Sequence, residues 1–485
     1  MINFSMIYKV LGALLYIEAM LLLMCFGMAI YYREDDVFAF AVSLITTLMA
    51  GLTLRYIGRN GNNTLSRREA YVVVSMSWII FSLFGTLPFL LSGYVTSFTD
   101  AFFETMSGFT TTGATVIDNI EIFPHGLLFW RSLTHWIGGL GIVFFTVAFL
   151  PSMTGGSVRV FAAEATGPIK SKLHPRLSTS AKWIWSVYTL LTLACILSYY
   201  LAGMSPFDAL NYAMATTATG GFSTHAASAE FFRSPTVEYL CTLFCFLSGV
   251  NFVLFYAAFV KWKWKRLFQS TEFRFYVGLI AAFTLFIMIE LILYRSYDIE
   301  HAFRSSLFTV VSFITTTGLF NDDAGTWPHV TWIVLAACMF FGGMSGSTSG
   351  GIKCIRGVMV FKIIKNEFKQ LLHPNAVLPL CIDGNNVPSQ KRTSLMAFLT
   401  IYVLLFVIAA FILTVAGIDS TNAVTIILSC LGNVGPTLGL DIGPTMSWSE
   451  LPVFIKWICS FYMLLGRLEI FSVLVIFLPS FWTEN

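Results

Sequence analysis

Thr110-Thr111-Thr112-Gly113 is the first of four similar segments that recur at intervals of about a hundred residues. The others are Thr217-Ala218-Thr219-Gly220, Thr315-Thr316-Thr317-Gly318 and Gly432-Asn433-Val434-Gly435. We call them the Thr/Gly segments. Each interrupts an apolar region, and non-helical backbone survives at membrane depth only where it is buried in protein or lines water. Four such interruptions predict one shared aqueous pore.

The composition is that of a membrane protein. Hydrophobic residues make up 56% of the chain, charged residues 11%, and the mean hydropathy is +0.75. A soluble domain carries about 25% charged residues. Apolar stretches of roughly the 20 residues that a spanning helix needs occur ten times, near 7–31, 36–57, 70–94, 127–150, 183–203, 237–260, 274–294, 330–364, 395–417 and 452–478.

The order of these stretches predicts an internal repeat. After a two-helix hairpin (1–65), each unit holds a span, a short re-entrant helix with its Thr/Gly segment, and a second span. The predicted units are 66–165, 166–265, 266–375 and 376–485. The predicted fold is therefore an all-α membrane protein with four pseudo-symmetric repeats around a central pore.

Helix-capping residue types mark where the re-entrant helices are expected to begin. Asp100, Ser305 and Asn422 stand thirteen residues before the last glycine of their segments, and Asp208 stands twelve before Gly220. About three helical turns fit between cap and segment, too few to cross a bilayer. The carbonyl ends of four such helices, pointed inward, favour a cation on the axis.

The chemistry expected of these segments is cation coordination by backbone carbonyl oxygens, which can replace the hydration shell of potassium. Glycine lets a carbonyl turn toward the axis because it adopts left-handed backbone without steric penalty. The alternative is that small residues only allow close helix packing, but four copies at matching positions favour the pore. The candidate potassium-binding residues are Thr111, Thr112, Gly113, Ala218, Thr219, Gly220, Thr316, Thr317, Gly318, Asn433, Val434 and Gly435.

The four segments are unequal, because the second contains Ala218 and the fourth contains Asn433 and Val434. Carbonyl geometry survives such changes, whereas hydroxyl contacts do not. We therefore expect a strong preference for potassium and rubidium over sodium without complete exclusion of sodium.

A second interruption, 342–351, lies within the eighth span and is called the Gly/Ser segment. Glycine in a helix interior costs up to about 1 kcal/mol, so this run is expected to leave the helix and form a flexible gate below the Thr/Gly segments. The alternative is a static kink relieved by Ser and Thr side chains. No Gly-Lys-Ser/Thr ending follows, so we expect no nucleotide to bind this chain. The candidate gate glycines are Gly342, Gly343, Gly346, Gly350 and Gly351.

Arg467 lies in the middle of the last span, where a charge is costly and usually faces a cavity or a partner. It is a candidate gate residue that opposes passing cations. The alternative role is an ion pair, although Glu469 is only two residues away and points to another helix face. Glu104 and Glu290 are expected to be structural or to face a cavity.

Lys and Arg gather in alternate loops, notably 151–182, 261–274 and 353–392, whereas the loops that hold the Thr/Gly segments contain few. Such an excess indicates the cytoplasmic side. Both termini are therefore predicted to be cytoplasmic. The basic loops are expected to contact anionic membrane lipid or a protein partner.

These features resemble the TrkH/KtrB/HKT superfamily of potassium transporters, and within it the bacterial TrkH branch. The resemblance rests on the four Thr/Gly segments, on His135-Trp136-Ile137-Gly138-Gly139-Leu140-Gly141 and on the Gly/Ser segment, and it covers about 70–480. It implies potassium uptake across the bacterial inner membrane, a homodimer, and a cytoplasmic nucleotide-binding regulatory subunit like TrkA. No nucleic acid partner is expected.

Two other functions have less support in the sequence. A proton- or sodium-coupled secondary transporter would carry broken helices in paired inverted repeats, whereas the four interruptions here share one orientation. An enzyme would need titratable residues clustered at one membrane face, but the seven His are scattered along the chain. We therefore expect neither catalytic residues nor a cofactor other than the transported potassium ion.

Overall fold

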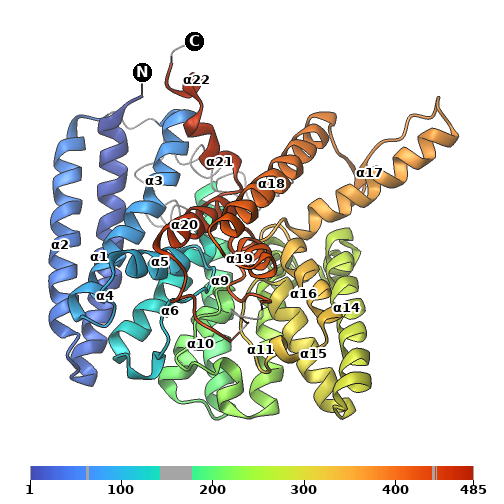
Figure 1. Cartoon of the computed structure of the whole chain (residues 1–485). Helices are drawn as coiled ribbons and strands as arrows, with labels where there is room; N and C mark the ends of the chain where they lie inside the picture. Colours follow the sequence, from blue (N-terminus) through green and yellow to red (C-terminus); the bar gives the residue numbers. More distant parts are fainter. Residues whose placement is uncertain (1, 62–64, 142–176, 440–442, 444, 484–485) are drawn as a thin grey trace.

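The computed structural model of the chain describes residues 2–61, 65–141, 177–439, 443 and 445–483 (Figure 1). The end of the predicted span 127–150 and most of the basic loop 151–182 lie outside the described residues. The described part is mostly helical, and its strands form one short antiparallel hairpin of β1 (Cys381–Ile382) and β2 (Asn385–Asn386).

Helices α1 (Phe4–Tyr32) and α2 (Val37–Ile57) form the predicted N-terminal hairpin, at the left of Figure 1. Both are apolar over more than 20 residues, so each can span a bilayer. Their backbones approach closely because Gly12 lies against α2. A Cβ atom at Gly12 would come within 2.8 Å of the Gly51 carbonyl oxygen. Small residues therefore hold this hairpin together, as is usual in lipid.

Four units follow, each with a first helix, a shorter re-entrant helix and a last helix. The first helices are α3 (Arg67–Gly85) with α4 (Leu87–Ser92), α9 (Leu177–Leu201), α14 (Thr271–Arg295) and α18 (Ser389–Val415). The re-entrant helices are α5 (Phe98–Phe109), α10 (Pro206–Ala218), α15 (Ile299–Ile314) and α19 (Ser420–Gly432). The last helices are α6 (His125–Leu140), α11 (Pro235–Ser248), α16 (His329–Phe341) and α20 (Val453–Arg467). This order confirms the predicted fold class.

The exact unit boundaries stay predictions, and the one at 265/266 falls inside the short helix α13 (Trp264–Gln269). Other short elements are η1 (Gly58–Asn60), η2 (Ile120–Ile122), η4 (Ser228–Phe232), η6 (Ala324–Thr326) and α22 (Pro479–Trp482).

Two predicted spans are not continuous helices. The span expected at 237–260 breaks after α11 and turns by 96° into α12 (Phe252–Phe255) and η5 (Tyr256–Val260). The span expected at 452–478 breaks after α20 and turns by 109° into α21 (Phe471–Leu474) and η7 (Val475–Phe477). By contrast, the break between α16 and α17 (Cys354–Leu372) was predicted.

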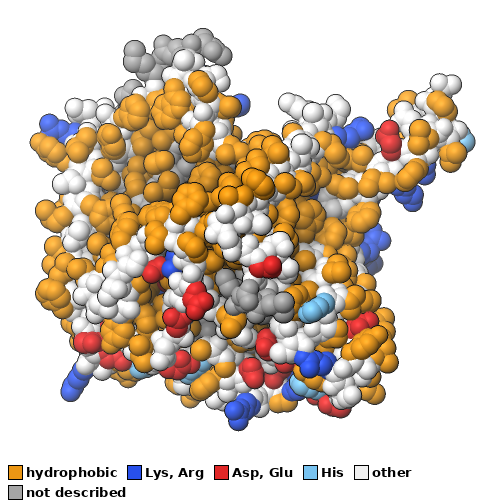
Figure 2. All heavy atoms as spheres, viewed as in Figure 1, with side chains coloured by type: hydrophobic (Ala, Val, Ile, Leu, Met, Phe, Trp, Pro, Cys, Tyr) orange, Lys and Arg blue, Asp and Glu red, His pale blue; other side chains and the backbone are white. Residues whose placement is uncertain are grey.

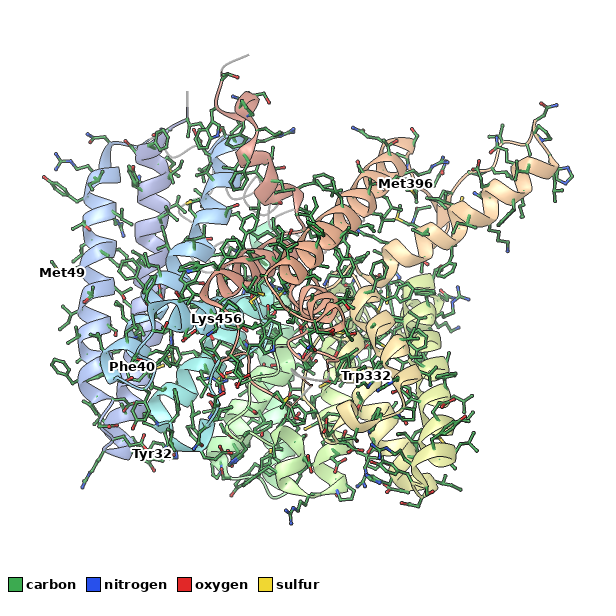
Figure 3. The ribbon with its side chains drawn as sticks, viewed as in Figure 1. Tyr32, Phe40, Met49, Trp332, Met396 and Lys456 are labelled. Atoms are coloured by element: carbon green, nitrogen blue, oxygen red, sulfur yellow. The ribbon has the colours of Figure 1, made fainter. Side chains whose placement is uncertain are left out.

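The surface is that of a multi-pass membrane protein. Figure 2 shows a broad band of hydrophobic side chains, with acidic side chains gathered near the lower edge of the view. Met49 on α2 and Met396 on α18 are 54% and 40% exposed, whereas Phe40 on α2 is buried (Figure 3). The described ends of the chain, at the start of α1 and just after α22, lie on the upper side in Figure 1, and α17 projects from the body.

Asp36, in the turn between α1 and α2, gives the fold a pH dependence. Burial, and then the carboxylates of Glu34 and Asp35, raises the pKa of Asp36 from 3.8 to about 6. The folded protein thus keeps a proton that the unfolded chain releases, so stability falls as the pH rises from about 4 to 6. We expect D36N to melt at a higher temperature than the wild type at pH 8, with the difference vanishing near pH 4. Equal melting temperatures at pH 8 would contradict this.

Candidate functional site

The four re-entrant helices all begin earlier than expected. Their N-caps are Ser97, Ser205, Asp298 and Asp419, each of which accepts a backbone N–H of the first turn. The predicted caps Asp100, Asp208, Ser305 and Asn422 lie inside the helices. In the first two units the serine three residues upstream caps the N–H of the acidic residue itself. Each helix ends where its Thr/Gly segment begins.

The Thr/Gly segments share one backbone pattern, in which the second and fourth residues are left-handed. The φ values are +52° and +82° for Thr111 and Gly113, +55° and +83° for Thr219 and Gly221, +57° and +79° for Thr316 and Gly318, and +53° and +98° for Asn433 and Gly435. Alternation of this kind is costly for residues with a side chain. Its recurrence in four places indicates that the surrounding structure imposes it.

The pattern corrects the register of the second segment. The prediction ended it at Gly220, but the left-handed glycine is Gly221. The counterparts of Thr111, Thr112 and Gly113 are therefore Thr219, Gly220 and Gly221, while Ala218 matches Thr110. A signal for this was present in the sequence, because Asp208 stands thirteen residues before Gly221, the same spacing as in the other units. From here, segments 1 to 4 denote 110–113, 218–221, 315–318 and 432–435.

The four segments close into a ring. In each, a Cβ atom on the fourth residue would collide with the carbonyl oxygen of the third residue of the next segment. The pairs are Gly113 with Gly220, Gly221 with Thr317, Gly318 with Val434, and Gly435 with Thr112. The order is cyclic, from segment 1 through 4 and back to 1. Glycine is thus required at the fourth position by φ and by space, and the third-position carbonyls meet around one centre.

Side chains brace the ring from behind. The hydroxyls of Thr110 and Thr112 lie 2.8 Å apart, as do those of Thr315 and Thr317. In segment 4 the amide of Asn433 replaces them. Its Nδ2 donates to Thr112 Oγ1 at 3.0 Å and to the Met463 carbonyl at 2.9 Å. Asn also tolerates left-handed backbone better than most residues, so the departure of segment 4 from the threonine pattern retains both functions.

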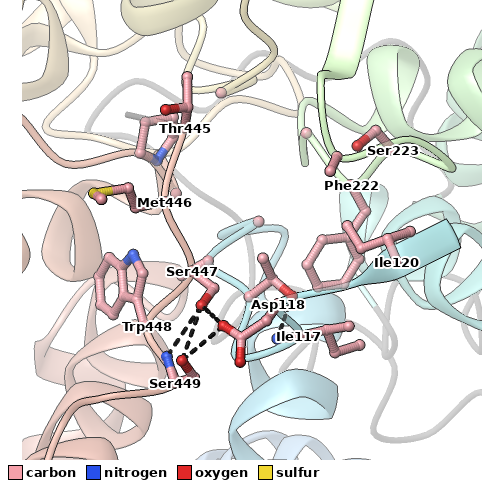
Figure 4. A pocket seen from close by; sticks show the side chains of 18 of the residues that line it. Ile117, Asp118, Ile120, Phe222, Ser223, Thr445, Met446, Ser447, Trp448 and Ser449 are labelled. Atoms are coloured by element: carbon pink, nitrogen blue, oxygen red, sulfur yellow. Dashed lines mark hydrogen bonds between the residues drawn. The ribbon is translucent and has the colours of Figure 1, made fainter. Parts of the chain in front are cut away.

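A cavity of about 390 Å³ opens beyond the fourth residues of the segments (Figure 4). Its lining includes all four of these glycines and the charged residues Asp118, Arg131 and Glu450. Ser449 donates to Asp118 at 2.7 Å, and Ser447 also donates to this carboxylate. The loop after segment 4 is therefore tied to the loop after segment 1 at the mouth of the ring.

The Gly/Ser segment runs beneath the other end of the ring. Gly342, Gly346 and Gly351 have φ of +68°, +78° and +69°, so the helix is broken as predicted. The segment contacts three units. Gly350 N–H donates to Thr316 Oγ1 at 2.6 Å, Thr348 Oγ1 to the Thr217 carbonyl at 3.0 Å, and Gly351 N–H to the Gly432 carbonyl at 2.8 Å. Cβ atoms at Gly343 and Gly350 would collide with Ser349 Oγ and the Gly432 carbonyl.

Arg467 joins this segment to the first unit. Its Nη1 donates to the Thr348 carbonyl at 3.0 Å, and its Nη2 lies 2.5 Å from the carbonyl oxygens of Gly138 and Gly139. Glu469 pairs with Arg356 at 2.6 Å. Arg467 thus contacts the Gly/Ser segment and the end of α6, and its role toward passing cations stays a prediction.

Sequence reasoning missed a second buried cation. Lys353 follows the Gly/Ser segment, is only 2% exposed, and donates from Nζ to the Ser349 carbonyl. Its backbone is left-handed, with φ of +77°. The one available signal was its place directly after the glycine run. Two cations thus hold two consecutive carbonyls of the segment, those of Thr348 and Ser349.

Sequence reasoning also missed the breaks after α11 and α20. Both breaks lie against the Gly/Ser segment. Met344 N–H donates to the Gly249 carbonyl at 2.9 Å, and Phe252 N–H donates to the Gly346 carbonyl at 3.0 Å. The broken end of α11 therefore packs on the Gly/Ser segment. A single glycine at 249 gave little sequence signal, because isolated glycines are tolerated in helices.

The fold and the ring define a multi-pass membrane protein with four re-entrant helices around one centre. A family model described as "TrkH: Cation transport protein" matches residues 37–483. The chain belongs to the TrkH family of cation transport proteins.

Individual relatives are similar over their whole length. The Trk system potassium uptake protein TrkH of Halomonas elongata is 37% identical over 99% of this chain and 100% of its own length. The protein of the same name from Escherichia coli K12 is 35% identical, with the same coverage. The crystal structure of the potassium transporter TrkH from Vibrio parahaemolyticus has a TM-score of 0.90 at 33% identity, covering 99% of this chain and 100% of that chain.

Asn433 offers a test of the ring's construction. N433G keeps the left-handed backbone but loses the two amide hydrogen bonds, worth about 1 kcal/mol each. N433A also carries the cost of left-handed backbone, about 1 kcal/mol more. We expect thermal stability in detergent to fall in the order wild type, N433G, N433A. A melting temperature for N433A at or above that of N433G would contradict the strained-backbone interpretation.

Proposed function

We propose that this chain carries potassium across the bacterial inner membrane through a channel-like pore. The observation that carries the proposal is the closed ring of four segments, each with a left-handed glycine against the carbonyl oxygen of the next. Carbonyl rings of this kind can take the place of water around a dehydrated potassium ion. The names of the relatives, which are potassium uptake proteins, point to the same ion.

In this proposal the ion contacts backbone atoms. The coordinating residues are Thr111, Thr112 and Gly113 in segment 1, with Thr219, Gly220 and Gly221, then Thr316, Thr317 and Gly318, then Asn433, Val434 and Gly435. The carbonyl ends of α5, α10, α15 and α19 lie next to the ring, and their dipoles favour a cation there. The side chains brace the backbone, so unequal segments still present comparable oxygens.

The Gly/Ser segment and Arg467 form the gate. The Gly/Ser segment binds residues of ring segments 3 and 4 and Thr217, which directly precedes ring segment 2. Arg467 places a fixed positive charge on the Thr348 carbonyl of the Gly/Ser segment. A cation that leaves the ring must displace the segment and pass this charge. The left-handed glycines make the segment deformable, because they allow alternative backbone conformations at low cost.

The partners and location follow the family. We propose a homodimer with both termini cytoplasmic and a TrkA-like nucleotide-binding regulatory subunit on that side. The support is family membership, together with α17, which projects from the body and carries exposed Lys365 and Lys369 beside exposed Phe368 and Leu371. This basic, partly apolar helix also suits contact with anionic lipid. No role as an enzyme and no nucleotide site on this chain is proposed.

One observation favours a second candidate, a proton-coupled transporter. His135 is fully buried, stacks on Phe222 with ring centroids 4.0 Å apart, and lies against the backbone of Gly220. A titratable ring beside segment 2 could link ion binding to protonation. Sodium-coupled transport has no comparable support among the described residues.

Flux through the purified chain in liposomes tests the proposal. We expect rapid rubidium and potassium uptake, slower sodium uptake, and no dependence on an imposed pH gradient. G221A should lower the flux at least about tenfold, because a Cβ at this left-handed position strains the ring. G278A is the matched control, since nothing lies within 4 Å of a Cβ there.

Comparable sodium and potassium permeability would refute the selectivity, and equal flux through G221A and G278A would refute the role of the ring. Uptake that requires a pH gradient and is lost in H135Q would favour the coupled transporter.

The gate predicts a gain of function. R467Q removes the charge that opposes a departing cation, and we expect it to raise the flux about tenfold, the equivalent of 1.4 kcal/mol. K265Q, at an exposed site, is the control. A lower flux together with a lower melting temperature would show instead that Arg467 is needed mainly for folding.

A further inference from the structure

A buried ion pair lies behind segments 1 and 2. Glu104 on α5 and Arg131 on α6 meet at 2.8 Å between Oε1 and Nε, and their side chains are 0% and 2% exposed. Removing two charges from water is costly, and replacing such a pair by apolar residues is often neutral or stabilising. Stability alone therefore does not account for charged residues at this place.

The pair holds the residues that directly follow the ring glycines. Glu104 accepts from Thr115 Oγ1 at 3.0 Å and from Val116 N–H at 3.0 Å, which fixes the chain after segment 1. Arg131 Nη2 donates to the same Thr115 hydroxyl at 3.3 Å. Arg131 also reaches the second unit, where its Nη1 donates to the carbonyl of Ser223 at 3.0 Å. Ser223 stands two residues after Gly221.

Arg131 also packs on Phe222, the residue between Gly221 and Ser223. Its guanidinium lies 4.1 Å from the centre of the Phe222 ring. The planar guanidinium thus uses separate nitrogens for Glu104, Thr115 and Ser223 and its face for Phe222. The stretches that directly follow segments 1 and 2, residues 114–116 and 222–223, are therefore joined through one rigid guanidinium group. Thr115, Arg131 and Ser223 line the cavity beyond the ring, in which Figure 4 labels Ser223.

The other units hold this position differently. The residue nine before the last ring glycine is Glu104 in unit 1, but Tyr212, Thr309 and Ile426 in units 2 to 4. Tyr212 binds the Ser228 carbonyl within its own unit. Between segments 2 and 3, Glu238 on α11 accepts from Asn321 Nδ2 at 2.5 Å and lies 3.6 Å from Arg304 Nε on α15. The charged linkage at the junction of segments 1 and 2 therefore comes from other helix positions than the one between segments 2 and 3.

We propose that Glu104 and Arg131 are positioning residues that set the ion selectivity of the ring. They act through the backbone, by keeping the outer ends of segments 1 and 2 at a fixed separation, and neither touches the ion. Selectivity is sensitive to this separation because the ion is coordinated only by carbonyl oxygens. The positions of these oxygens depend on the supporting side chains. The inference rests on the proposed potassium pore.

The test is the potassium-to-sodium permeability ratio, taken from reversal potentials in reconstituted bilayers, together with melting temperature. E104Q/R131Q removes both charges together, so that no uncompensated charge is buried. Glutamine matches glutamate in size and is smaller than arginine, so the melting temperature is measured beside the ratio. We expect the permeability ratio to fall about tenfold, which corresponds to the interaction energy typical of residues in direct contact. Potassium should still permeate.

E34Q/H125Q is the control. It disrupts another pair, His125 Nδ1 with Glu34 Oε1 at 2.7 Å, which joins the N-terminal hairpin to the start of α6, the helix that carries Arg131. Neither residue lines the cavity beyond the ring. We expect this variant to keep the wild-type ratio even where its melting temperature falls.

R131K provides a second, independent test of the permeability ratio if the double variant does not fold. Lysine keeps the charge but lacks the planar fork that binds Glu104, Thr115 and Ser223 together, so the ratio should again fall. A wild-type ratio in R131K, or in a folded E104Q/R131Q, would overturn the inference. Loss of potassium permeability in the wild-type chain itself would instead overturn the proposed function.

Discussion

The need to satisfy every backbone polar group inside a membrane governs this structure. Most of the chain meets it with helices. The four Thr/Gly segments cannot, because their alternating left-handed residues interrupt the helical hydrogen-bond pattern. They are possible only because they meet one another at a common centre, where the third-position carbonyl oxygen of each segment lies against the glycine of the preceding segment. The re-entrant helices, their caps and the broken last helices all serve to bring these segments together.

The ring has cyclic order but unequal corners, and the inequality lies in what supports each corner. Threonine hydroxyls pair behind segments 1 and 3, whereas the Asn433 amide reaches across from segment 4 to segment 1. The Glu104–Arg131 pair joins the stretches that directly follow segments 1 and 2, through Val116 and Ser223. A single polypeptide with four non-identical repeats can thus keep one backbone geometry while each support changes.

The ring and the Gly/Ser segment are physically continuous. Gly350 binds the Thr316 hydroxyl, and Gly351 binds the last carbonyl of α19. Arg467 and Lys353 hold the adjacent carbonyls of Thr348 and Ser349. A shift of this segment would therefore change the hydrogen bonds at the inner end of the ring. Under the proposed function, gating and ion binding share these contacts.

Much of this architecture could be predicted from the sequence. The apolar stretches and the four Thr/Gly segments were sufficient for the fold class, and the glycine run was sufficient for the break between α16 and α17. Helix starts were placed too late, because acidic residues inside the first turn are of the same types as caps. The second segment was misplaced by one residue because two adjacent glycines, 220 and 221, are equivalent until the backbone is known.

What the sequence determined by itself is the set of local possibilities: which stretches enter the membrane and where the backbone must leave the helix. These follow from side-chain polarity and from glycine's conformational freedom, which are properties of short stretches. Only the tertiary structure decided which glycine faces which carbonyl, that Arg467 contacts Gly138 and Gly139, and that Glu104 meets Arg131. Those choices depend on distances between residues far apart in the chain, and such distances exist only once the four units have packed around one axis.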